Sequence, residues 1–350
     1  MNLKSLRTLG RSGLPVSPLC LGTMTFGRQD WGSPDTVSQS IFDSYVDAGG
    51  NFIDTADVYA VGRSEELVGQ FIAERNLRDQ LVLATKYTWN STENNPLAGG
   101  NGRKNLNRAL EGSLQRLGTD YIDLYWVHAW DKITPVEEVV QSLSELVSAG
   151  KIRYYGFSNV PAWYTARAAT LAQTHNVPGP IALQMEYSLV ERSIENEHIP
   201  AAQELGLGIV PWSPLAFGFL TGKYSREDQS EQGQGEGRLN SGSPMFQKFS
   251  ESNWKILDAL REVSEEANLS LPKVALSWAL SRPGITSLIL GASKVEQLHD
   301  NIASLEVELT PQQLTRLSDA SAPAPLYPYT VFSEQINSSI FNGISVQPWR

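Results

Sequence analysis

The chain contains a single cysteine, Cys20, among its 350 residues. One thiol cannot form an internal disulfide or a cysteine-ligated metal cage, so the sequence excludes both. Apolar runs of membrane-spanning length are also missing, and residues 1–13 lack the apolar core of a secretory signal peptide. We therefore expect a protein of the reducing cytoplasm that is stabilised by its own apolar core.

Basic residues are scarce relative to acidic ones, with 28 Lys and Arg against 38 Asp and Glu and a formal net charge of -10. Nucleic acids and anionic membrane surfaces are bound by basic faces, so neither is expected as a partner. The hydrophobic content of 41% allows a substantial core. We expect one domain over residues 1–350 that acts on or binds a small molecule, as a monomer or a homo-oligomer.

Several common site signatures are absent as well. No Gly-x-Gly-x-x-Gly occurs, and the stretch from Gly218 to Lys223 is one residue short of a phosphate-binding P-loop and is followed by Tyr224 instead of Ser or Thr. The motifs Gly-x-Ser-x-Gly and His-Glu-x-x-His are missing too, which removes the basis for a hydrolase or a zinc enzyme. We expect no metal site.

What the chain does contain is a regular alternation of short apolar runs with longer amphipathic segments. The runs cover residues 19–23, 52–55, 81–86, 121–128, 154–158, 182–186, 208–212 and 287–291. Helical patterns between them cover residues 35–48, 104–117, 135–149, 161–174, 199–205, 272–281 and 294–303. Such alternation predicts a parallel α/β sheet built from right-handed strand-helix-strand units. Eight units without a mid-chain linker favour a closed (β/α)8 TIM barrel over residues 19–317, although a doubly wound open sheet has the same local alternation.

Four stretches depart from this alternation. Residues 3–20 predict a β-hairpin that acts as a lid or plug, and the long polar segment 88–102 predicts a functional loop above the barrel. Segment 225–243 has almost no apolar residues and is expected to be mobile. The C-terminal tail, residues 320–350, is rich in Pro and aromatic residues. We expect it to pack on the protein without forming a regular element.

Three successive apolar runs lead to titratable side chains. The first leads through Asp54 to Tyr59, the second ends in Lys86 and the third ends in His128. In a parallel barrel these positions lie together at the carboxyl-terminal face. A lysine beside a tyrosine favours the phenolate and lowers the pKa of the phenol, and a carboxylate keeps the lysine charged. The set suits protonation of an oxygen while another group reduces the adjoining carbon; a purely structural Asp54–Lys86 ion pair is the competing interpretation.

These residues lie in motifs that resemble those of the aldo-keto reductases. Residues 51–59 and their continuation Gly62-Arg63-Ser64-Glu65-Glu66-Leu67-Val68-Gly69 are similar to the family signature. Further matches are Gly156-Phe157-Ser158-Asn159, Gln184-Met185-Glu186-Tyr187, Trp212-Ser213-Pro214-Leu215 and Gly291-Ala292-Ser293. The resemblance runs from about Leu19 to Leu317 and implies a (β/α)8 barrel that reduces aldehydes or ketones. It implies Tyr59 as proton donor, Asp54 and Lys86 as the pair that tunes it, and His128 as the group that orients the carbonyl.

The same resemblance implies a nicotinamide cofactor, with NADP(H) preferred and NAD as the alternative. It places Ser158, Asn159 and Gln184 on the carboxamide and Trp212 on the nicotinamide ring. The other implied cofactor contacts are Gly22, Thr23, Met24, Asp54, Ser213, Pro214, Leu215, Gly218, Lys223, Gly291, Ser293, Lys294, Gln297 and Asn301. Of these, Ser213, Leu215, Gly218 and Lys223 would line the pyrophosphate, Ser293 and Lys294 the 2′-phosphate, and Gln297 and Asn301 the adenine. Some family members carry arginine where Gln297 stands, so recognition of the phosphate here depends on Lys294.

Three tryptophans, Trp31, Trp89 and Trp130, follow three of the strand runs. We expect them to bind the substrate together with Tyr59 and His128, because an aromatic wall favours aryl or other apolar carbonyl compounds. The alternative role for these large side chains is to pin the loops by packing.

Two other functions stay open at this point. The Gly-Phe-Ser-Asn and Trp-Ser-Pro-Leu segments resemble the subgroup that contains bacterial reductases, aryl-alcohol dehydrogenases and potassium-channel β subunits, so a cofactor-binding regulatory subunit is one alternative. A Schiff-base aldolase that uses Lys86 as nucleophile is the other, and it would need no nicotinamide.

Overall fold

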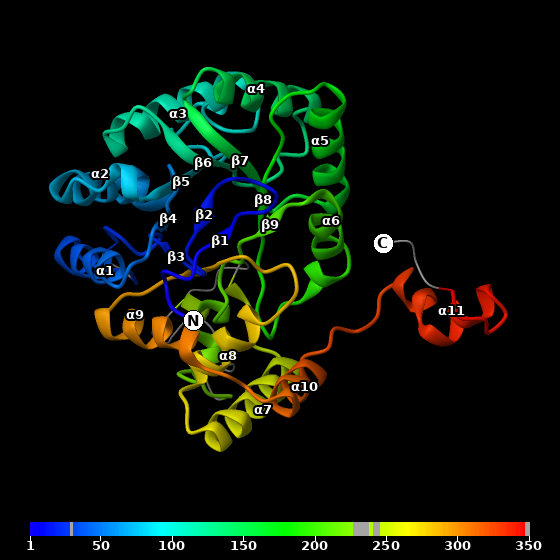
Figure 1. Cartoon of the computed structure of the whole chain (residues 1–350). Helices are drawn as coiled ribbons and strands as arrows, with labels where there is room; N and C mark the ends of the chain where they lie inside the picture. Colours follow the sequence, from blue (N-terminus) through cyan, green and yellow to red (C-terminus); the bar gives the residue numbers. More distant parts are fainter. Residues whose placement is uncertain (29–30, 227–237, 241–245, 347–350) are drawn as a thin grey trace.

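Eight parallel strands form the centre of the protein in a computed structural model that describes residues 1–28, 31–226, 238–240 and 246–346 (Figure 1). The strands are β3 (Leu19–Gly22), β4 (Phe52–Asp54), β5 (Val82–Tyr87), β6 (Ile122–Val127), β7 (Ile152–Ser158), β8 (Ala182–Gln184), β9 (Gly208–Ile209) and β10 (Leu288–Leu290). They pair in the order β10-β3-β4-β5-β6-β7-β8-β9. The two end strands also meet, because Ile209 forms a parallel bridge with Ile285 and its carbonyl accepts the Thr286 N–H at 2.8 Å. The sheet curls closed, and the predicted (β/α)8 fold is confirmed.

Helices surround this sheet on the outside (Figure 1). They are α1 (Asp35–Asp47), α2 (Arg63–Arg75), α3 (Arg103–Leu117), α4 (Val136–Ser148), α5 (Ala162–Thr174), α6 (His198–Leu205), α7 (Glu251–Ala267), α8 (Leu271–Leu280), α9 (Val295–Ile302) and α10 (Pro311–Ala320). In α4, for example, Val139, Val140 and Leu143 are buried against the sheet side at helical spacing. Helix α2 was not predicted from the sequence, because Gly69 in its interior weakens the helical pattern of residues 63–75. Gly69 lies so close to α3 that a Cβ atom there would be 2.5 Å from the Leu117 carbonyl oxygen.

A two-stranded hairpin, β1 (Arg7–Thr8) and β2 (Pro15–Val16), covers the amino-terminal end of the barrel (Figure 1). It is shorter than the predicted span of residues 3–20, because residues 19 and 20 belong to β3. Gly10, at its turn, has φ +62°, and a Cβ atom there would be 2.5 Å from the Ile181 carbonyl oxygen. Its apolar side chains join the barrel interior in one buried cluster that includes Leu9, Leu14, Val16, Cys20, Phe52 and Val82. The hairpin therefore forms an apolar floor, as the plug interpretation predicts.

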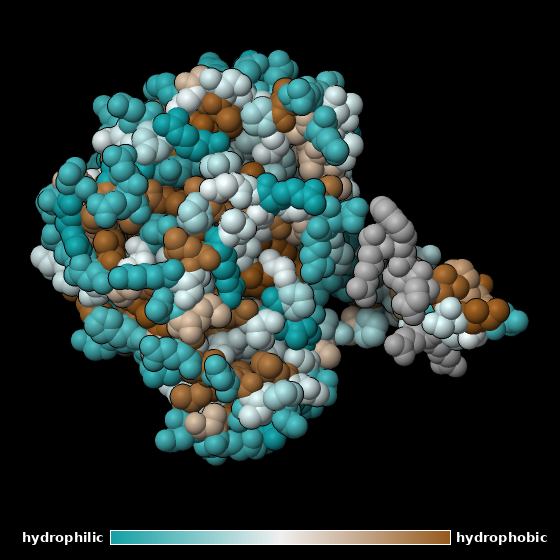
Figure 2. Space-filling model, viewed as in Figure 1, coloured by the Kyte–Doolittle hydropathy of each residue, from teal (hydrophilic) through white to brown (hydrophobic). Residues whose placement is uncertain are grey.

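The C-terminal tail contains regular structure, so the prediction that it forms no regular element was wrong. The chain has no proline between Pro328 and Pro348, and this stretch forms a 3-10 turn and α11 (Glu334–Ile340). The tail lies outside the ring of helices, beyond α6 (Figure 1), where the Tyr329 hydroxyl donates to Glu197 Oε1 at 2.7 Å. Its apolar side chains are exposed (Figure 2), including Leu326, Tyr327, Val331, Phe332, Ile336, Ile340 and Phe341.

Two other segments, residues 88–102 and 225–243, were also expected to depart from the alternation of strands and helices. The segment 88–102 is held in place by Asn101, which is buried, receives a hydrogen bond from the Thr88 hydroxyl at 2.6 Å and donates to the Ala129 carbonyl at 2.8 Å. Most of segment 225–243 lies outside the described residues. In the described part of the chain, every helix is too short or too polar to cross a bilayer.

Candidate active site

Parallel register brings the predicted titratable side chains together at the carboxyl ends of β4, β5 and β6. Asp54 ends β4 and pairs with Ala84, so Lys86 lies two residues further along β5. The Lys86 ammonium donates to Asp54 Oδ2 in a short ion pair, to the Thr55 carbonyl at 2.7 Å and to the Tyr59 hydroxyl at 3.2 Å. All three protons of the ammonium therefore have an acceptor. This contact joins the predicted proton donor to its predicted tuning pair.

Gln184 completes the surroundings of Asp54. Its side-chain nitrogen, at the end of β8, donates to Asp54 Oδ1 at 2.9 Å, and both residues are buried. Each carboxylate oxygen of Asp54 thus accepts a charged or amide donor, which fixes the orientation of the group. Because the side-chain nitrogen of Gln184 donates to Asp54, the Oε1 atom of Gln184 can accept a hydrogen bond from the carboxamide of a nicotinamide.

Burial and charge act in opposite directions on the three groups. Burial raises the pKa of Asp54 above its ordinary value, while Lys86 and the Gln184 hydrogen bond oppose the rise. Burial disfavours the charged form of Lys86, but Asp54 and Tyr59 outweigh it, so the pKa of Lys86 is raised. Lys86 therefore stays cationic, which argues against an aldolase with a neutral amine nucleophile.

The pKa of Tyr59 is raised above its ordinary value, whereas the sequence predicted that Lys86 lowers it. Lys86 does favour the phenolate, but burial is the larger effect and Asp54 adds to it. The phenol is carried on a turn in which three successive residues have positive φ: Ala60 at 47°, Val61 at 56° and Gly62 at 92°. Left-handed backbone is costly for a β-branched residue such as Val61. The strained turn holds the hydroxyl within reach of Lys86.

His128 borders the phenol. Its ring centroid lies 5.9 Å from that of Tyr59 at an interplanar angle of 81°. Burial, together with Lys86, holds the pKa of His128 well below its usual range, so the imidazole is neutral near pH 7. Its Nδ1 atom has no hydrogen-bond partner among the described residues. A neutral imidazole beside a phenol can donate one hydrogen bond to a carbonyl oxygen.

Three residues predicted to hold the nicotinamide lie in contact beyond His128. Asn159 follows β7 with φ 51°, and its side-chain nitrogen donates to the His128 carbonyl and the Ser158 hydroxyl, both at 3.0 Å. The Trp212 indole N–H donates to Asn159 Oδ1 at 3.3 Å. Trp212 thereby fixes which way the Asn159 amide points, a role that a phenylalanine could not fill.

The segment after Trp212 is a tight loop with left-handed backbone at several residues. Positive φ recurs at Ser213, Ala216, Phe217 and Gly218, with values of 51°, 49°, 57° and 93°. The N–H groups of Ala216 and Gly218 donate within the loop, to the Ser213 carbonyl at 2.8 Å and the Leu215 carbonyl at 2.9 Å, so the group that this loop offers to an anion is the Lys223 ammonium. A Cβ atom on Gly218 would lie 3.2 Å from Nζ of Lys223, so the ammonium stands directly over the glycine. The predicted pyrophosphate residues therefore fit an anionic group.

The other predicted cofactor residues lie at the ends of β3 and β10. Thr23 is buried beside Asp54, whose carbonyl accepts the Thr23 N–H at 2.9 Å. After β10, Gln297 Oε1 accepts the Ser293 N–H at 3.0 Å and is within 3.2 Å of the Ser293 hydroxyl, so Gln297 shapes this turn. Lys294 is exposed at the start of α9. Of the remaining predicted contacts, Gly22 and Met24 lie at the end of β3, Pro214 and Leu215 follow β9, and Gly291 follows β10, whereas Asn301 is buried within α9.

The three tryptophans have different surroundings. Trp89 lies 6.0 Å from His128 between ring centroids and is 46% exposed, so it stands at the opening of the site. Trp130 packs against Trp163 at the start of α5, at 5.5 Å between centroids, which fits the loop-packing role. Trp31 lies between two guanidinium groups, those of Arg28 and Arg238, each 4.2 Å from a ring centroid.

Sequence reasoning missed the contacts that Arg238, Phe246 and Lys248 make with the barrel. Arg238 reaches Trp31, and Lys248 forms an ion pair with Glu186 after β8 at 2.6 Å. Phe246 also lies 4.7 Å from Phe217 between ring centroids. These partners are 29 to more than 200 residues apart, and no local pattern signals them. Phe246 therefore packs against the predicted cofactor loop.

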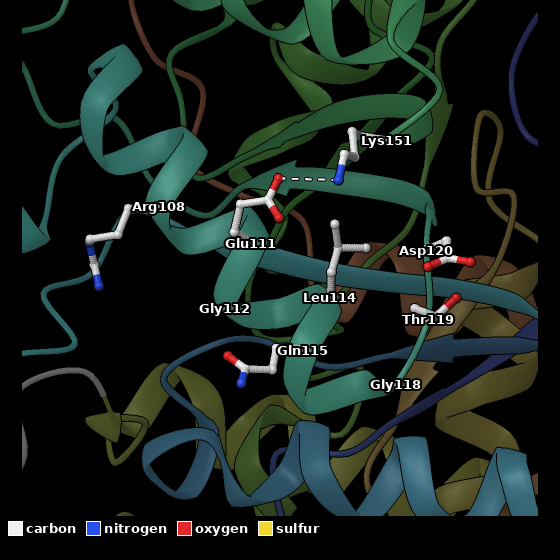
Figure 3. Close-up of a pocket in the computed structure, with 9 residues that line it drawn as sticks. All are labelled: Arg108, Glu111, Gly112, Leu114, Gln115, Gly118, Thr119, Asp120 and Lys151. Carbon is white, nitrogen blue, oxygen red and sulfur yellow. Dashed lines mark ion pairs between the residues drawn. The ribbon is translucent and has the colours of Figure 1, made fainter.

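A separate hollow lies on the outer side of α3 (Figure 3). It is lined by Arg108, Glu111, Gly112, Leu114, Gln115, Gly118, Thr119, Asp120 and Lys151. Lys151 and Glu111 face each other across it at 3.3 Å. Asp120 lies two residues before β6 and Lys151 directly precedes β7, so the hollow is at the amino-terminal end of these strands, opposite the end where Tyr59 lies. Within the described ranges, no group of three or more His, Cys, Asp or Glu side chains is placed to hold a metal ion.

The contact of Tyr59 with Lys86 and the nearby His128 suit an oxidoreductase that acts on carbonyl compounds. A model of the Aldo/keto reductase family matches residues 18–322. The chain belongs to this family, whose members use NAD(P)H.

Curated relatives cover most of the chain. Norsolorinic acid reductase stcV of Emericella nidulans is 38% identical over 319 residues, which are 88% of this chain and 79% of the relative. The aryl-alcohol dehydrogenase [NADP(+)] of Phanerodontia chrysosporium is 33% identical over 92% of this chain and 87% of its own. A probable voltage-gated potassium channel subunit beta of Oryza sativa subsp. japonica is 36% identical over 89% of this chain and 94% of its own.

Proposed function

We propose that the protein is a cytoplasmic, NADP-dependent reductase that converts aryl or other apolar aldehydes and ketones to alcohols. The observation that carries the proposal is the contact of the Lys86 ammonium with both the Tyr59 hydroxyl and Asp54. A phenol in this position can give up a proton, because the adjacent ammonium stabilises the phenolate that remains.

In the proposed reaction NADPH supplies a hydride to the carbonyl carbon. Tyr59 donates the proton of its hydroxyl to the carbonyl oxygen, and Lys86 stabilises the phenolate while Asp54 keeps Lys86 charged. His128, which is neutral, donates a hydrogen bond that orients the carbonyl toward the phenol. Trp89 stands beside His128 and limits the access of water to the reacting atoms.

Recognition of NADP(H) is assigned to the loop with positive φ and to the turn after β10. Lys223 over Gly218 supports binding of the pyrophosphate, and Lys294 at the start of α9 supports binding of the 2′-phosphate, since a helix amino terminus and an ammonium both favour an anion. The name of the aryl-alcohol dehydrogenase relative, which specifies NADP(+), supports the same preference.

An aromatic substrate class has two supports. Trp89 borders His128 at the opening of the site, and the names of two relatives refer to norsolorinic acid and aryl alcohols. Flat aromatic side chains favour aryl groups through offset or edge-to-face contacts. Substituted benzaldehydes are therefore the first compounds to test.

The function is tested by following NADPH oxidation with aromatic, aliphatic and sugar carbonyl compounds, and by repeating the best reaction with NADH. We expect multiple turnovers, the highest kcat/KM with an aromatic aldehyde, and a preference for NADPH over NADH. If the protein binds no nicotinamide nucleotide, the reductase proposal fails. If sugars are reduced best, the aromatic substrate class fails.

The second candidate is a cofactor-binding regulatory subunit, and the observation that favours it is the potassium channel relative, which matches 94% of its own length. This candidate predicts tight nucleotide binding with very slow turnover and a stable complex with a membrane protein. Fast multiple turnovers in the same assay would argue against a regulatory subunit, because this candidate predicts very slow turnover.

Replacing Gly218 with alanine is expected to weaken NADPH binding about tenfold, since the new Cβ meets Lys223 in a strained backbone. The atom would be 2.9 Å from Lys223 Cε, and φ at this position is +93°. Gly118→Ala is the matched control, because Gly118 also has positive φ but a Cβ there meets nothing within 4 Å. Fluorescence titration with NADPH measures both; equal affinity in the two variants would argue against a phosphate site at Gly218.

A further inference from the structure

Asp57 carries a buried carboxyl group that the proposed mechanism does not use. In the sequence it lies between Asp54 and Tyr59, two residues of the proposed site. The side chain is 4% exposed. The backbone N–H of Asp57 donates to the Lys86 carbonyl at 3.2 Å, which ties this residue to the strand that carries the ammonium. Its Oδ1 atom has no hydrogen-bond partner among the described residues. A buried carboxylate oxygen without a donor is unfavourable, and a proton relieves it.

A second buried carboxyl group, Glu65 at the start of α2, shares this region behind the barrel wall. It is fully buried and accepts hydrogen bonds from the Thr85 hydroxyl at 2.5 Å and from Arg116 Nε at 2.7 Å. Arg116 is thereby committed to Glu65 by a direct ion pair. The cluster of Asp57, Glu65 and Arg116 therefore has two acids and one directly bound cation, which favours the uptake of one proton.

Other charged or titratable groups face Asp57 from each element packed around it. Arg108 on α3 favours its ionised form, but its guanidinium is bonded to the Ser91 hydroxyl, the Ala98 carbonyl and Asn105. The charged or titratable groups that interact with the carboxyl are Glu65 on α2, Arg116 and Arg108 on α3, Tyr125 on β6 and Tyr59, and the Val58 N–H donates a hydrogen bond to it. Burial first, and Glu65 second, raise the pKa of Asp57 to about 7, with Arg116 opposing them. Asp57 therefore changes charge in the neutral range.

The cluster is also in contact with the turn that carries the phenol. A Cβ atom on Gly62 would lie 2.8 Å from Cδ of Arg116, so the arginine packs directly against the strained turn of residues 59–62. A negative charge on Asp57 favours the neutral phenol of Tyr59 over the phenolate, whereas Lys86 favours the phenolate. The charge of Asp57 is thus felt at the group proposed to transfer the proton.

We propose that Asp57 is a positioning residue that binds a proton from solvent near neutral pH and thereby makes Tyr59 a stronger proton donor. The inference rests on the proposed function, because Asp57 acts through Tyr59. Below the transition Asp57 is neutral, the phenol loses its proton more readily, and reduction is fast. Above it the negative charge holds the proton on Tyr59, and reduction slows.

The test is the pH profile of the hydride-transfer step, measured in single turnovers of the full chain with NADPH and a benzaldehyde between pH 6 and 8.5. One charge change in a protein interior alters the pKa of a neighbouring phenol by about one unit. The rate of proton donation changes by only part of that factor, so we expect the rate of hydride transfer to fall about threefold as pH rises, centred near pH 7. Asp57→Asn should lose this step and keep the rate of the acidic plateau. Asp57→Glu should retain a step.

Glu65→Gln provides an independent test. It removes one of the two acids, so Arg116 no longer has a carboxylate partner in Glu65 and stabilises the ionised form of Asp57. The step should then move to lower pH. A flat wild-type profile, a step that persists in Asp57→Asn, or an unmoved step in a folded Glu65→Gln protein would overturn the inference. Circular dichroism and thermal unfolding establish that each variant is folded. Failure of the proposed function would appear differently, as no NADPH binding and no reduction by the wild type at any pH, and a wrong proton donor would appear as a full rate in Tyr59→Phe.

Discussion

Tyr59→Phe is expected to lower kcat for carbonyl reduction about 10³-fold, within the range that a positioned general acid contributes. The substitution removes the hydroxyl that contacts Lys86 at 3.2 Å and leaves the ring against His128. NADPH affinity should stay within about twofold, because the interactions assigned to the nucleotide do not involve the phenol. Steady-state rates and NADPH titration on the same preparation measure both quantities.

A matched control for this substitution is Tyr87→Phe. Tyr87 directly follows Lys86 in β5, is fully buried, and its hydroxyl has no hydrogen-bond partner among the described residues. Removing that hydroxyl should leave kcat and stability nearly unchanged. If Tyr59→Phe behaves like Tyr87→Phe, another group donates the proton and the mechanism proposed for Tyr59 is wrong.

Lys86→Met is expected to remove activity and to destabilise the fold by about 3–5 kcal/mol, the usual cost of leaving one member of a buried ion pair alone. The Asp54 and Lys86 side chains are 3% and 0% exposed, so water cannot replace the lost partner. Urea unfolding at pH 7 measures the loss of stability. An unchanged midpoint would contradict the burial of an uncompensated charge.

The pH dependence of this variant has a defined sign. Burial already raises the pKa of Asp54, and removal of Lys86 removes the opposing attraction. A carboxyl group whose pKa is higher in the folded state stabilises the fold at low pH and loses that contribution as pH rises through the folded value. The difference between Lys86→Met and wild type should therefore shrink as pH falls. The double variant Asp54→Asn, Lys86→Met should recover stability at pH 7 without recovering activity.

Those features of the site that depend on strand register were predictable from the sequence. Asp54, Lys86 and His128 each end or follow a run of buried apolar residues, and parallel pairing places such positions at one face. The roles of the residues came from the family resemblance and stay a prediction, because contacts between side chains do not report what each group does in a reaction. The fold followed from the same eight runs, because alternation with helices leaves few ways to bury both faces of a parallel sheet.

Features set by long-range packing were not predictable. The stack of Arg238 on Trp31 and the ion pair of Lys248 with Glu186 join segments that no periodicity relates. The direction of the Tyr59 pKa depends on how completely the phenol is buried, which a motif does not report. Helix α11 was missed because the tail was judged by its prolines and aromatic residues as a whole, although residues 333–340 contain no proline.

The hairpin floor of the barrel has a kinetic consequence. Leu9, Leu14 and Val16 fill the amino-terminal end of the barrel against Phe52 and Val82. The hydride donor and the carbonyl compound must then share the opening at the other end, and the reactant that sits deeper has to enter first and leave last. A hairpin remote from every reacting atom would in this way impose an ordered sequence of binding and release.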